Sequence, residues 1–394
     1  MPNLTIFVSK IYNMSQHIER ILFPILEDKL FKGKALILMG ARQVGKSTLM
    51  HRLISNRTER ILNLNGDDPE VRSILGNATL SSLRRIVADY KVVFVDEAQR
   101  IENIGISLKQ IADNMPDVQL LVSGSSSLDL RSKINEPLTG RKFEYILYPV
   151  SAEEIYGQFG LVETRSTLEE RMIYGSYPEI VTHPAEAEEL LVNLTESYLY
   201  KDLLAYEGVR KPGLINKLLV ALALQVGSEV SYNELGKTVG SDSKTVEKYI
   251  DLLEKCYVVF RLDAYSRNLR NELRKSKKIY FYDTGVRNAV IGNFTRLDGR
   301  SDAGALWENY FISERIKFNK YHSHRVRQYF WRTSAQQEVD YIEEDSEGGL
   351  HAFEMKWNPK KGSISLPSTF VDTYHPKTVE VITPENYLDW LLPE

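Results

Sequence analysis

Cysteine is almost absent from this sequence, because among 394 residues Cys256 is the only one. A disulfide within the chain needs two thiols, and a zinc site of the cysteine type needs several, so both are excluded. A single cysteine is typical of proteins kept in a reducing compartment. We therefore expect a cytoplasmic protein.

Long apolar segments are lacking as well. The most apolar helical candidate, residues 218–226, is far shorter than the roughly 18 apolar residues that span a membrane. The apolar residues 4–8 lack the basic lead and the long apolar core of a secretory signal. The sequence therefore predicts neither a membrane protein nor an exported one.

An excess of charge of one sign is the third property that is missing. The 50 Lys and Arg residues nearly balance the 53 Asp and Glu residues, which gives a formal net charge of −3. This balance does not indicate a globally basic nucleic-acid binder, although it leaves local basic patches open. With 43% apolar and 26% charged residues the composition is that of a globular protein, and 394 residues predict two or three domains.

The sequence is organised around a glycine-rich loop that follows the apolar run 35–39. Its glycines allow backbone N–H groups to turn toward a phosphate, and the dipole of the helix behind the loop attracts an anion. Lys46 is expected to reach the β and γ phosphates, and the Ser47 hydroxyl to bind Mg²⁺. The predicted phosphate-binding residues are Gly40, Ala41, Arg42, Gln43, Val44, Gly45, Lys46, Ser47 and Thr48.

Two acids follow a second apolar run, residues 92–95. Four consecutive apolar residues are typical of a strand that is buried on both faces of a parallel sheet. Asp96 at the end of this strand is expected to hold Mg²⁺, and Glu97 to activate the attacking water as a general base. Beside a phosphate-binding loop, this pair indicates hydrolysis of a nucleotide rather than a solvated strand end.

Small polar residues end a third apolar run, residues 120–122. Ser123 or Ser125 is expected to orient the attacking water or to contact the γ-phosphate; Ser125 is the candidate catalytic residue, and the choice between the two is open. Arg141, which precedes a further predicted strand over 142–147, is a candidate arginine finger in cis or in trans. An ordinary surface arginine is the alternative, and action in trans would require a homo-oligomer.

Together these motifs resemble the AAA-type P-loop ATPases of prokaryotes. The resemblance covers residues 30–150 and rests on the glycine-rich loop, on Val-Asp-Glu-Ala-Gln at 95–99, on Ser-Gly-Ser-Ser-Ser at 123–127 and on Leu-Thr-Gly-Arg at 138–141. It implies an α/β fold with a doubly wound parallel sheet, and ATP with Mg²⁺ as cofactors. We expect this domain to occupy residues 1–150, with helices over 11–34 and 70–88 and a strand over 60–65.

The middle of the sequence predicts helices followed by a winged helix. Residues 151–195 carry helical patterns and are predicted to form a lid or linker, whereas residues 196–290 show three helices and a β-wing. Such a fold either reads DNA or docks a protein, and both remain open. Seven basic residues against two acids over 261–280 favour contact with DNA or RNA, with a solvated loop as the alternative.

The last predicted domain, residues 291–394, carries a second set of acids. Glu354 and Lys356 alternate on one face of a predicted strand, Asp340 lies on the preceding strand, and Glu308 lies in a helix over 305–318. The pattern resembles the PD-(D/E)XK nucleases, in which two acids bind Mg²⁺ and the lysine positions the water.

This resemblance implies metal binding by Asp340 and Glu354 with Lys356, and Glu308 as an accessory acid. Val339 stands where the pattern has proline, which leaves activity open. A set of surface ion pairs on an inactive, nuclease-like α/β domain is the alternative.

The predicted function is Mg²⁺-dependent ATP hydrolysis coupled to movement of the C-terminal domains on DNA or RNA. The alternative is an ATP-dependent switch that docks a protein partner through an inactive nuclease-like domain. A small-molecule kinase is less favoured, because Glu97 beside Asp96 suits activation of water.

Overall fold

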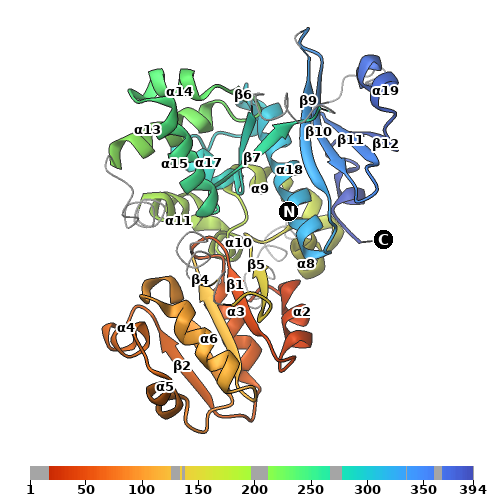
Figure 1. Ribbon diagram of the computed structural model, residues 1–394. Helices are drawn as coiled ribbons and strands as arrows, with labels where there is room; N and C mark the ends of the chain where they lie inside the picture. Colours follow the sequence, from red (N-terminus) through yellow and green to blue (C-terminus); the bar gives the residue numbers. More distant parts are fainter. Residues whose placement is uncertain are drawn as a thin grey trace.

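Two β-sheets organise the chain. The computed structural model describes residues 17–125, 134, 138–196, 212–266, 277–333, 335–358 and 366–393. In Figure 1 the first sheet and its helices, red to yellow, lie below the C-terminal part, green to blue, and helices α8 (Ala152–Ser166) and α10 (Pro178–Thr182) lie between them. In the described ranges, no helix is long and apolar enough to cross a membrane.

The first sheet has five strands, all parallel, in the order β2-β3-β4-β1-β5. Its strands are β1 (Ala35–Met39), β2 (Ile61–Asn65), β3 (Val92–Asp96), β4 (Gln119–Gly124) and β5 (Lys142–Ile146). Every residue of β1 and β4 is buried, as expected of central parallel strands. The predicted α/β fold with a parallel sheet is confirmed.

The helices of this domain are shorter than the sequence predicts. They are α2 (Leu22–Lys29), α3 (Lys46–Ser55), α4 (Pro69–Gly76), α5 (Leu80–Val87), α6 (Ile104–Asn114) and the 3₁₀ turn η1 (Ala98–Arg100). The predicted helix over 11–34 is too long. Residues 17–21 precede α2 and residues 30–34 follow it, whereas residues 11–16 lie outside the described part. The single helix predicted over 70–88 is two helices, because the Thr79 side chain accepts the Ser82 N–H and starts α5 anew.

The C-terminal part alternates helices and strands. Besides α8 and α10, its described helices are α9 (Leu168–Tyr174), α11 (Ala187–Leu194), α13 (Pro212–Leu224), α14 (Tyr232–Val239), α15 (Ser243–Lys255), α17 (Thr284–Ile291), α18 (Ala303–Tyr321) and α19 (Ser368–Tyr374), with 3₁₀ turns η2 (Pro184–Glu186), η4 (Leu297–Gly299) and η5 (Tyr387–Trp390). Its strands are β6 (Glu229–Val230), β7 (Val259–Ala264), β8 (Lys277–Phe281), β9 (Arg327–Arg332), β10 (Glu338–Glu344), β11 (Leu350–Met355) and β12 (Thr378–Ile382). The three helices and the hairpin strands occur in the order that a winged helix requires, and that assignment stays a prediction.

All seven C-terminal strands belong to one sheet, in the order β12-β11-β10-β9-β7-β8-β6. Strand β7 pairs with β9 in parallel, with Asp263 opposite Tyr329 and Ala264 opposite Phe330. The predicted boundary at residue 290 therefore does not separate two sheets. Strands from both sides of it share one hydrogen-bonded surface, and α18 packs against β8 and β11 on either side of this boundary.

Candidate nucleotide site and acidic pocket

The glycine-rich loop leaves β1 and enters α3, as its sequence predicts. Gly40 has a φ of 152° and Gly45 a φ of 92°, a backbone region that favours glycine. A Cβ on Gly40 would overlap the Leu147 carbonyl, so this position also needs the absence of a side chain. Lys46 is 5% exposed, and its ammonium donates to the carbonyls of Gly40 (3.1 Å) and Ala41 (2.6 Å). The lysine is thus held over the loop that would enclose a phosphate.

Asp96 and Glu97 lie at the carboxyl end of β3, two strands from the loop. The Ser123 hydroxyl donates to Asp96 Oδ1, and the Glu97 N–H donates to the same oxygen at 3.0 Å. Glu97 adopts φ 48° and ψ 40°, a left-handed conformation that is uncommon for a residue with a side chain. Such conformations cluster at functional sites, which fits the predicted role of Glu97.

Gln99 connects Glu97 to the serine at the end of β4. Its side-chain amide donates to Glu97 Oε2 and to the Ser125 hydroxyl at 3.0 Å. The two candidate serines therefore have different partners: Ser123 bonds to Asp96, the predicted metal ligand, and Ser125 bonds to Gln99. Gln99 is part of the Val-Asp-Glu-Ala-Gln motif, but the sequence alone assigns it no role. Its position two residues after Glu97 is the one feature of the sequence that could have indicated this contact.

Gly66, after β2, supports the same turn from the other side. Its N–H donates to the Asp96 carbonyl at 2.8 Å, and a Cβ on it would overlap the Glu97 carbonyl. The role of Gly66 could not be predicted, because an Asn-Gly pair does not indicate which distant part of the backbone the glycine contacts.

Arg141 lies at the opposite edge of the sheet. Its carbonyl accepts the Ala35 N–H at the start of β1, about 16 Å from the loop at the end of that five-residue strand. Its guanidinium pairs with Asp113 at the end of α6. Arg141 is therefore not among the residues that the structure brings to the nucleotide site of its own chain.

Arg20 is a second residue that the sequence analysis missed. It is 6% exposed and donates to the Val44 carbonyl of the glycine-rich loop at 2.7 Å, to the Tyr148 carbonyl at 2.6 Å and to Glu154 Oε1 at 3.0 Å. No local pattern could reveal these partners, because they lie 24 to 134 residues away.

Two of the predicted acids and the predicted lysine line a cavity of about 450 Å³. Glu308, Asp340 and Lys356 line it together with Trp357. Tyr341 on β10 pairs with Phe353 on β11, which makes Asp340 and Glu354 the next residues on the two strands. The predicted set thus comes together, as the alternation along these strands indicates.

Each of these acids has a partner within the protein. Glu354 Oε1 pairs with the Lys356 ammonium at 2.5 Å, and Asp340 Oδ2 accepts the Met355 N–H at 2.8 Å. Glu308 Oε1 accepts from the Lys278 ammonium at 2.8 Å and from the Tyr280 hydroxyl. In the described ranges, no three His, Cys, Asp or Glu side chains are grouped as a metal site would require.

Lys278 is an unexpected partner of these acids. It comes from β8, its side chain is fully buried, and it pairs with both Glu308 and Glu338. Burial alone would lower the pKa of Lys278, but the neighbouring carboxylates raise it, so the ammonium stays charged. Burial raises the pKa of Glu308 to about 7 despite this cation, and burial also raises the pKa of Asp340.

The predicted basic stretch 261–280 is less free than its charge indicates. Arg261 pairs with Asp251 and Glu254, and Lys277 with Asp263 at 3.6 Å. Lys278 is buried and pairs with Glu308 and Glu338. The other four basic residues, Arg267, Arg270, Arg274 and Lys275, lie outside the described part of the chain.

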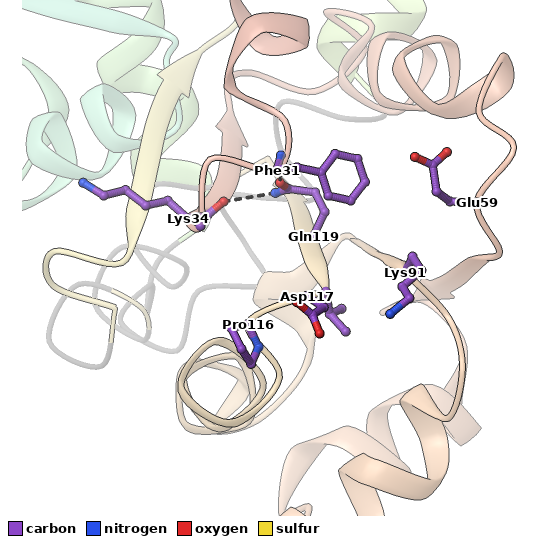
Figure 2. Close-up of a pocket in the computed structure, with 9 residues that line it drawn as sticks. Phe31, Lys34, Glu59, Lys91, Pro116, Asp117 and Gln119 are labelled. Carbon is purple, nitrogen blue, oxygen red and sulfur yellow. Dashed lines mark hydrogen bonds between the residues drawn. The ribbon is translucent and has the colours of Figure 1, made fainter.

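A second cavity, of about 400 Å³, opens at the amino ends of the first sheet (Figure 2). Lys34 and Gln119, which line it, stand at the starts of β1 and β4, and the Gln119 amide donates to the Lys34 carbonyl at 3.0 Å. Because the strands are parallel, this cavity lies at the edge opposite to the glycine-rich loop. It is therefore separate from the candidate nucleotide site.

Three family models match successive parts of the chain. Residues 32–156 match a family described as AAA domain. Residues 165–297 and 303–387 match two families, each described as a domain of unknown function (DUF8612 and DUF4143). The DUF8612 match over residues 165–297 spans most of the predicted lid together with the predicted winged helix.

Relatives with similar sequences are uncharacterised. The uncharacterized protein Rv2008c of Mycobacterium tuberculosis is 28% identical over 356 residues, which cover 88% of this chain and 76% of the relative. The uncharacterized protein MJ1637 of Methanocaldococcus jannaschii is 24% identical over 313 residues, 68% of this chain and 66% of the relative.

A solved structure supports the fold. The Walker-type ATPase PABY2304 of Pyrococcus abyssi superposes with a TM-score of 0.50 at 14% identity, over 71% of this chain and 99% of that chain. At this identity the likeness concerns the fold alone. Together with the family match over residues 32–156, it supports an AAA-type P-loop fold for the first domain, a fold that implies nucleotide binding.

Proposed function

We propose that the protein hydrolyses ATP with Mg²⁺ and uses the nucleotide to change the state of its C-terminal part. The observation that supports this best is the row of polar residues at one edge of the parallel sheet. The loop after β1, the serines after β4 and the acids after β3 lie side by side there, where α/β sheets bind ligands.

The residue roles follow from this arrangement. Lys46 and the N–H groups of residues 40–48 hold the phosphates. The Ser47 hydroxyl and the Asp96 carboxylate suit Mg²⁺, which prefers oxygen ligands and neutralises phosphate charge when bound. Glu97, held by Gln99, accepts the proton of the attacking water.

Two substitutions test this assignment. Lys46→Ala should abolish ATP binding, because the loop loses the buried ammonium that is held at the Gly40 and Ala41 carbonyls. Glu97→Gln should keep binding and lower phosphate release by about a hundredfold. Equilibrium binding of a fluorescent ATP analogue and a phosphate-release assay separate the two effects. Unchanged turnover of the Glu97→Gln variant would reject the role of Glu97.

For the C-terminal part we propose docking of a protein partner. This proposal is supported by the partners that Glu308, Asp340 and Glu354 have within the protein, because these partners balance the charges of the acids. The second candidate is a nuclease that acts on DNA or RNA. It is favoured by Asp340 and Lys356, which line the cavity, and by Glu354, which pairs with Lys356.

A cleavage assay with Mg²⁺ or Mn²⁺ decides between these candidates. The docking function predicts no cutting of DNA or RNA and no stimulation of ATP turnover by either. Cutting that Asp340→Ala and Lys356→Ala abolish would establish the nuclease and reject docking through an inactive pocket.

Arg141 as an arginine finger is a further proposal that requires a homo-oligomer. Because Arg141 lies at the far edge of its own sheet, it would have to serve the site of a neighbouring copy. Mass measurement in solution with and without ATP tests this, and a chain that stays monomeric in both conditions while hydrolysing ATP would reject it.

A further inference from the structure

Arg20 joins the glycine-rich loop to two other parts of the chain. Three of its bonds reach the loop at Val44, the exit of β5 at Tyr148 and the first turn of α8 at Glu154. Hydrogen bonds from a charged donor are stronger than neutral ones, and burial strengthens them further. With only 6% of Arg20 exposed, these three parts are held in one fixed arrangement.

The bond to Val44 acts on the part of the loop that would face the nucleotide. A peptide unit is planar and trans, so a carbonyl and the N–H that follows it point in opposite directions. Holding the Val44 carbonyl toward Arg20 directs the Gly45 N–H to the other side, where the loop would enclose a phosphate. Arg20 therefore sets the direction of one phosphate-binding N–H group.

Glu154 ties Arg20 to the start of α8. Its Oε1 accepts from Arg20 and from the Ile21 N–H at 3.0 Å, and its Oε2 accepts the Ser151 N–H at 2.9 Å as part of a capping box. Movement of Arg20 must therefore disturb the cap of α8.

Residues 148–154, which lead from β5 into α8, form a junction segment. The last two turns of α18 also hold this segment. Three bonds make this contact: Tyr148 N to Tyr321 Oη (3.1 Å), Ala152 N to Glu314 Oε2 (2.7 Å) and Lys317 Nζ to Val150 O (3.3 Å). Thus the same segment contacts Arg20 and α18. Glu308 of the acidic pocket lies on α18 as well, 13 residues before Tyr321 and about 20 Å along the helix axis.

We propose that Arg20 is a positioning residue that sets the shape of the glycine-rich loop and transmits nucleotide binding through the junction segment to α18. The inference rests on the proposed ATP binding and deepens it, since it names the route by which the site acts on the C-terminal part. When bound phosphate shifts the Val44–Gly45 peptide, the hydrogen bond from Arg20 to Val44 changes. Arg20 then moves Tyr148 and Glu154, to which it also bonds.

The first test measures the loop. Arg20→Ala should weaken binding of a fluorescent ATP analogue by about tenfold or more, because the Gly45 N–H loses its fixed direction. Arg20→Lys should recover part of this loss, since lysine keeps a charged donor. Arg60→Ala is the matched control, because Arg60 forms an exposed pair with Asp89 at the start of β2. Equal affinity of Arg20→Ala and Arg60→Ala would overturn the positioning role.

The second test measures transmission and does not depend on the fold of the arginine variants. Hydrogen exchange of residues 310–321 is followed with and without a non-hydrolysable ATP analogue. We expect the analogue to change protection of these amides in the natural chain. Tyr321→Phe keeps the ring but removes the hydroxyl that accepts the Tyr148 N–H and also interacts with Arg20, so it should lose most of this change. A full nucleotide response in Tyr321→Phe would overturn transmission through the junction segment.

These outcomes differ from a failure of the proposed function. If the natural chain does not bind ATP at all, the proposed function fails before either test applies. If it binds ATP but does not hydrolyse it, the role of Glu97 fails while both tests on Arg20 and Tyr321 still give an answer.

Discussion

Gln99 gives the predicted base its position. A carboxylate that must accept a proton from one water has to be held in one rotamer, and the Gln99 amide does this by joining Glu97 to Ser125. Gln99→Ala should therefore lower the turnover number for ATP by about tenfold or more and change the affinity for ATP little. Steady-state phosphate release gives both values.

A double-variant cycle is the control for Gln99. Ser125→Ala removes the other end of the same bridge, so the double variant should be little slower than either single variant. Additive losses would show that Gln99 and Ser125 act independently and would contradict the bridge.

Glu308 predicts a dependence of stability on pH. Its pKa is raised by burial from 4.5 to about 7, so between these values the folded chain holds a proton that the unfolded chain has lost. The free energy of unfolding should therefore fall as pH rises from 4.5 to 7, by an amount on the order of 3 kcal/mol from this group. Glu308→Gln should remove this fall.

The measurement is urea unfolding of both chains at several pH values with a metal chelator present. As pH rises from 5 to 8, the free energy of unfolding of the natural chain should fall relative to that of Glu308→Gln. A difference that is the same at all pH values would show that Glu308 titrates alike in both states.

At the scale of elements, the strands of the first sheet could be predicted because central parallel strands are continuous apolar runs. The glycine-rich loop and the acids after β3 could be found because each directly follows such a run. The partners Gly66 and Arg20 of the nucleotide site and Lys278 of the acidic cluster could not be found, since they act through contacts with segments far away in the sequence.

The helix predicted over 11–34 failed for a physical reason. Its apolar spacing is real, but the residues pack in two places. Ile18 contacts a small cluster with Val150 and Ile155, whereas Leu22 and Leu26 pack in the core of the first domain. Helical spacing thus arose from two separate contacts, and the helix begins only at Leu22.

Gly66 carries the prediction at this scale. A Cβ there would overlap the Glu97 carbonyl, so Gly66→Ala must shift the turn that presents the two acids. We expect ATP binding to be retained, because the glycine-rich loop is separate, and ATP turnover to fall by about tenfold or more. Phosphate release and analogue binding measure the two.

Gly157→Ala in α8 is the matched control. No atom lies within 4 Å of the position that its Cβ would take, and the helical backbone accepts alanine. This variant should turn over ATP normally and be as stable as the natural chain or about 1 kcal/mol more stable. If Gly66→Ala behaves like Gly157→Ala, the turn tolerates a side chain and the argument from close approach is wrong.

At the scale of the whole molecule, the C-terminal part is tied together across the predicted boundary at residue 290. One buried cluster contains Phe260 and Tyr280 from before it and Trp307 and Phe330 from after it. Lys278 pairs across it with Glu308 and Glu338. The acidic cluster therefore includes a side chain from before residue 290, although the residues that line the cavity all follow it.

A chain that ends at residue 290 should consequently fail to fold as the full chain does. It loses β9, which leaves the edge of β7 unpaired, and it leaves the Lys278 ammonium without its two carboxylates, a loss that costs about 3–5 kcal/mol for a buried pair. We expect residues 1–290 to aggregate or to lack fixed tertiary packing in the C-terminal third. Size-exclusion chromatography and near-UV circular dichroism, compared with the full chain, measure this. A monomeric residue 1–290 chain with native-like packing would show that the boundary at 290 divides independent domains and that the shared sheet forms after each has folded.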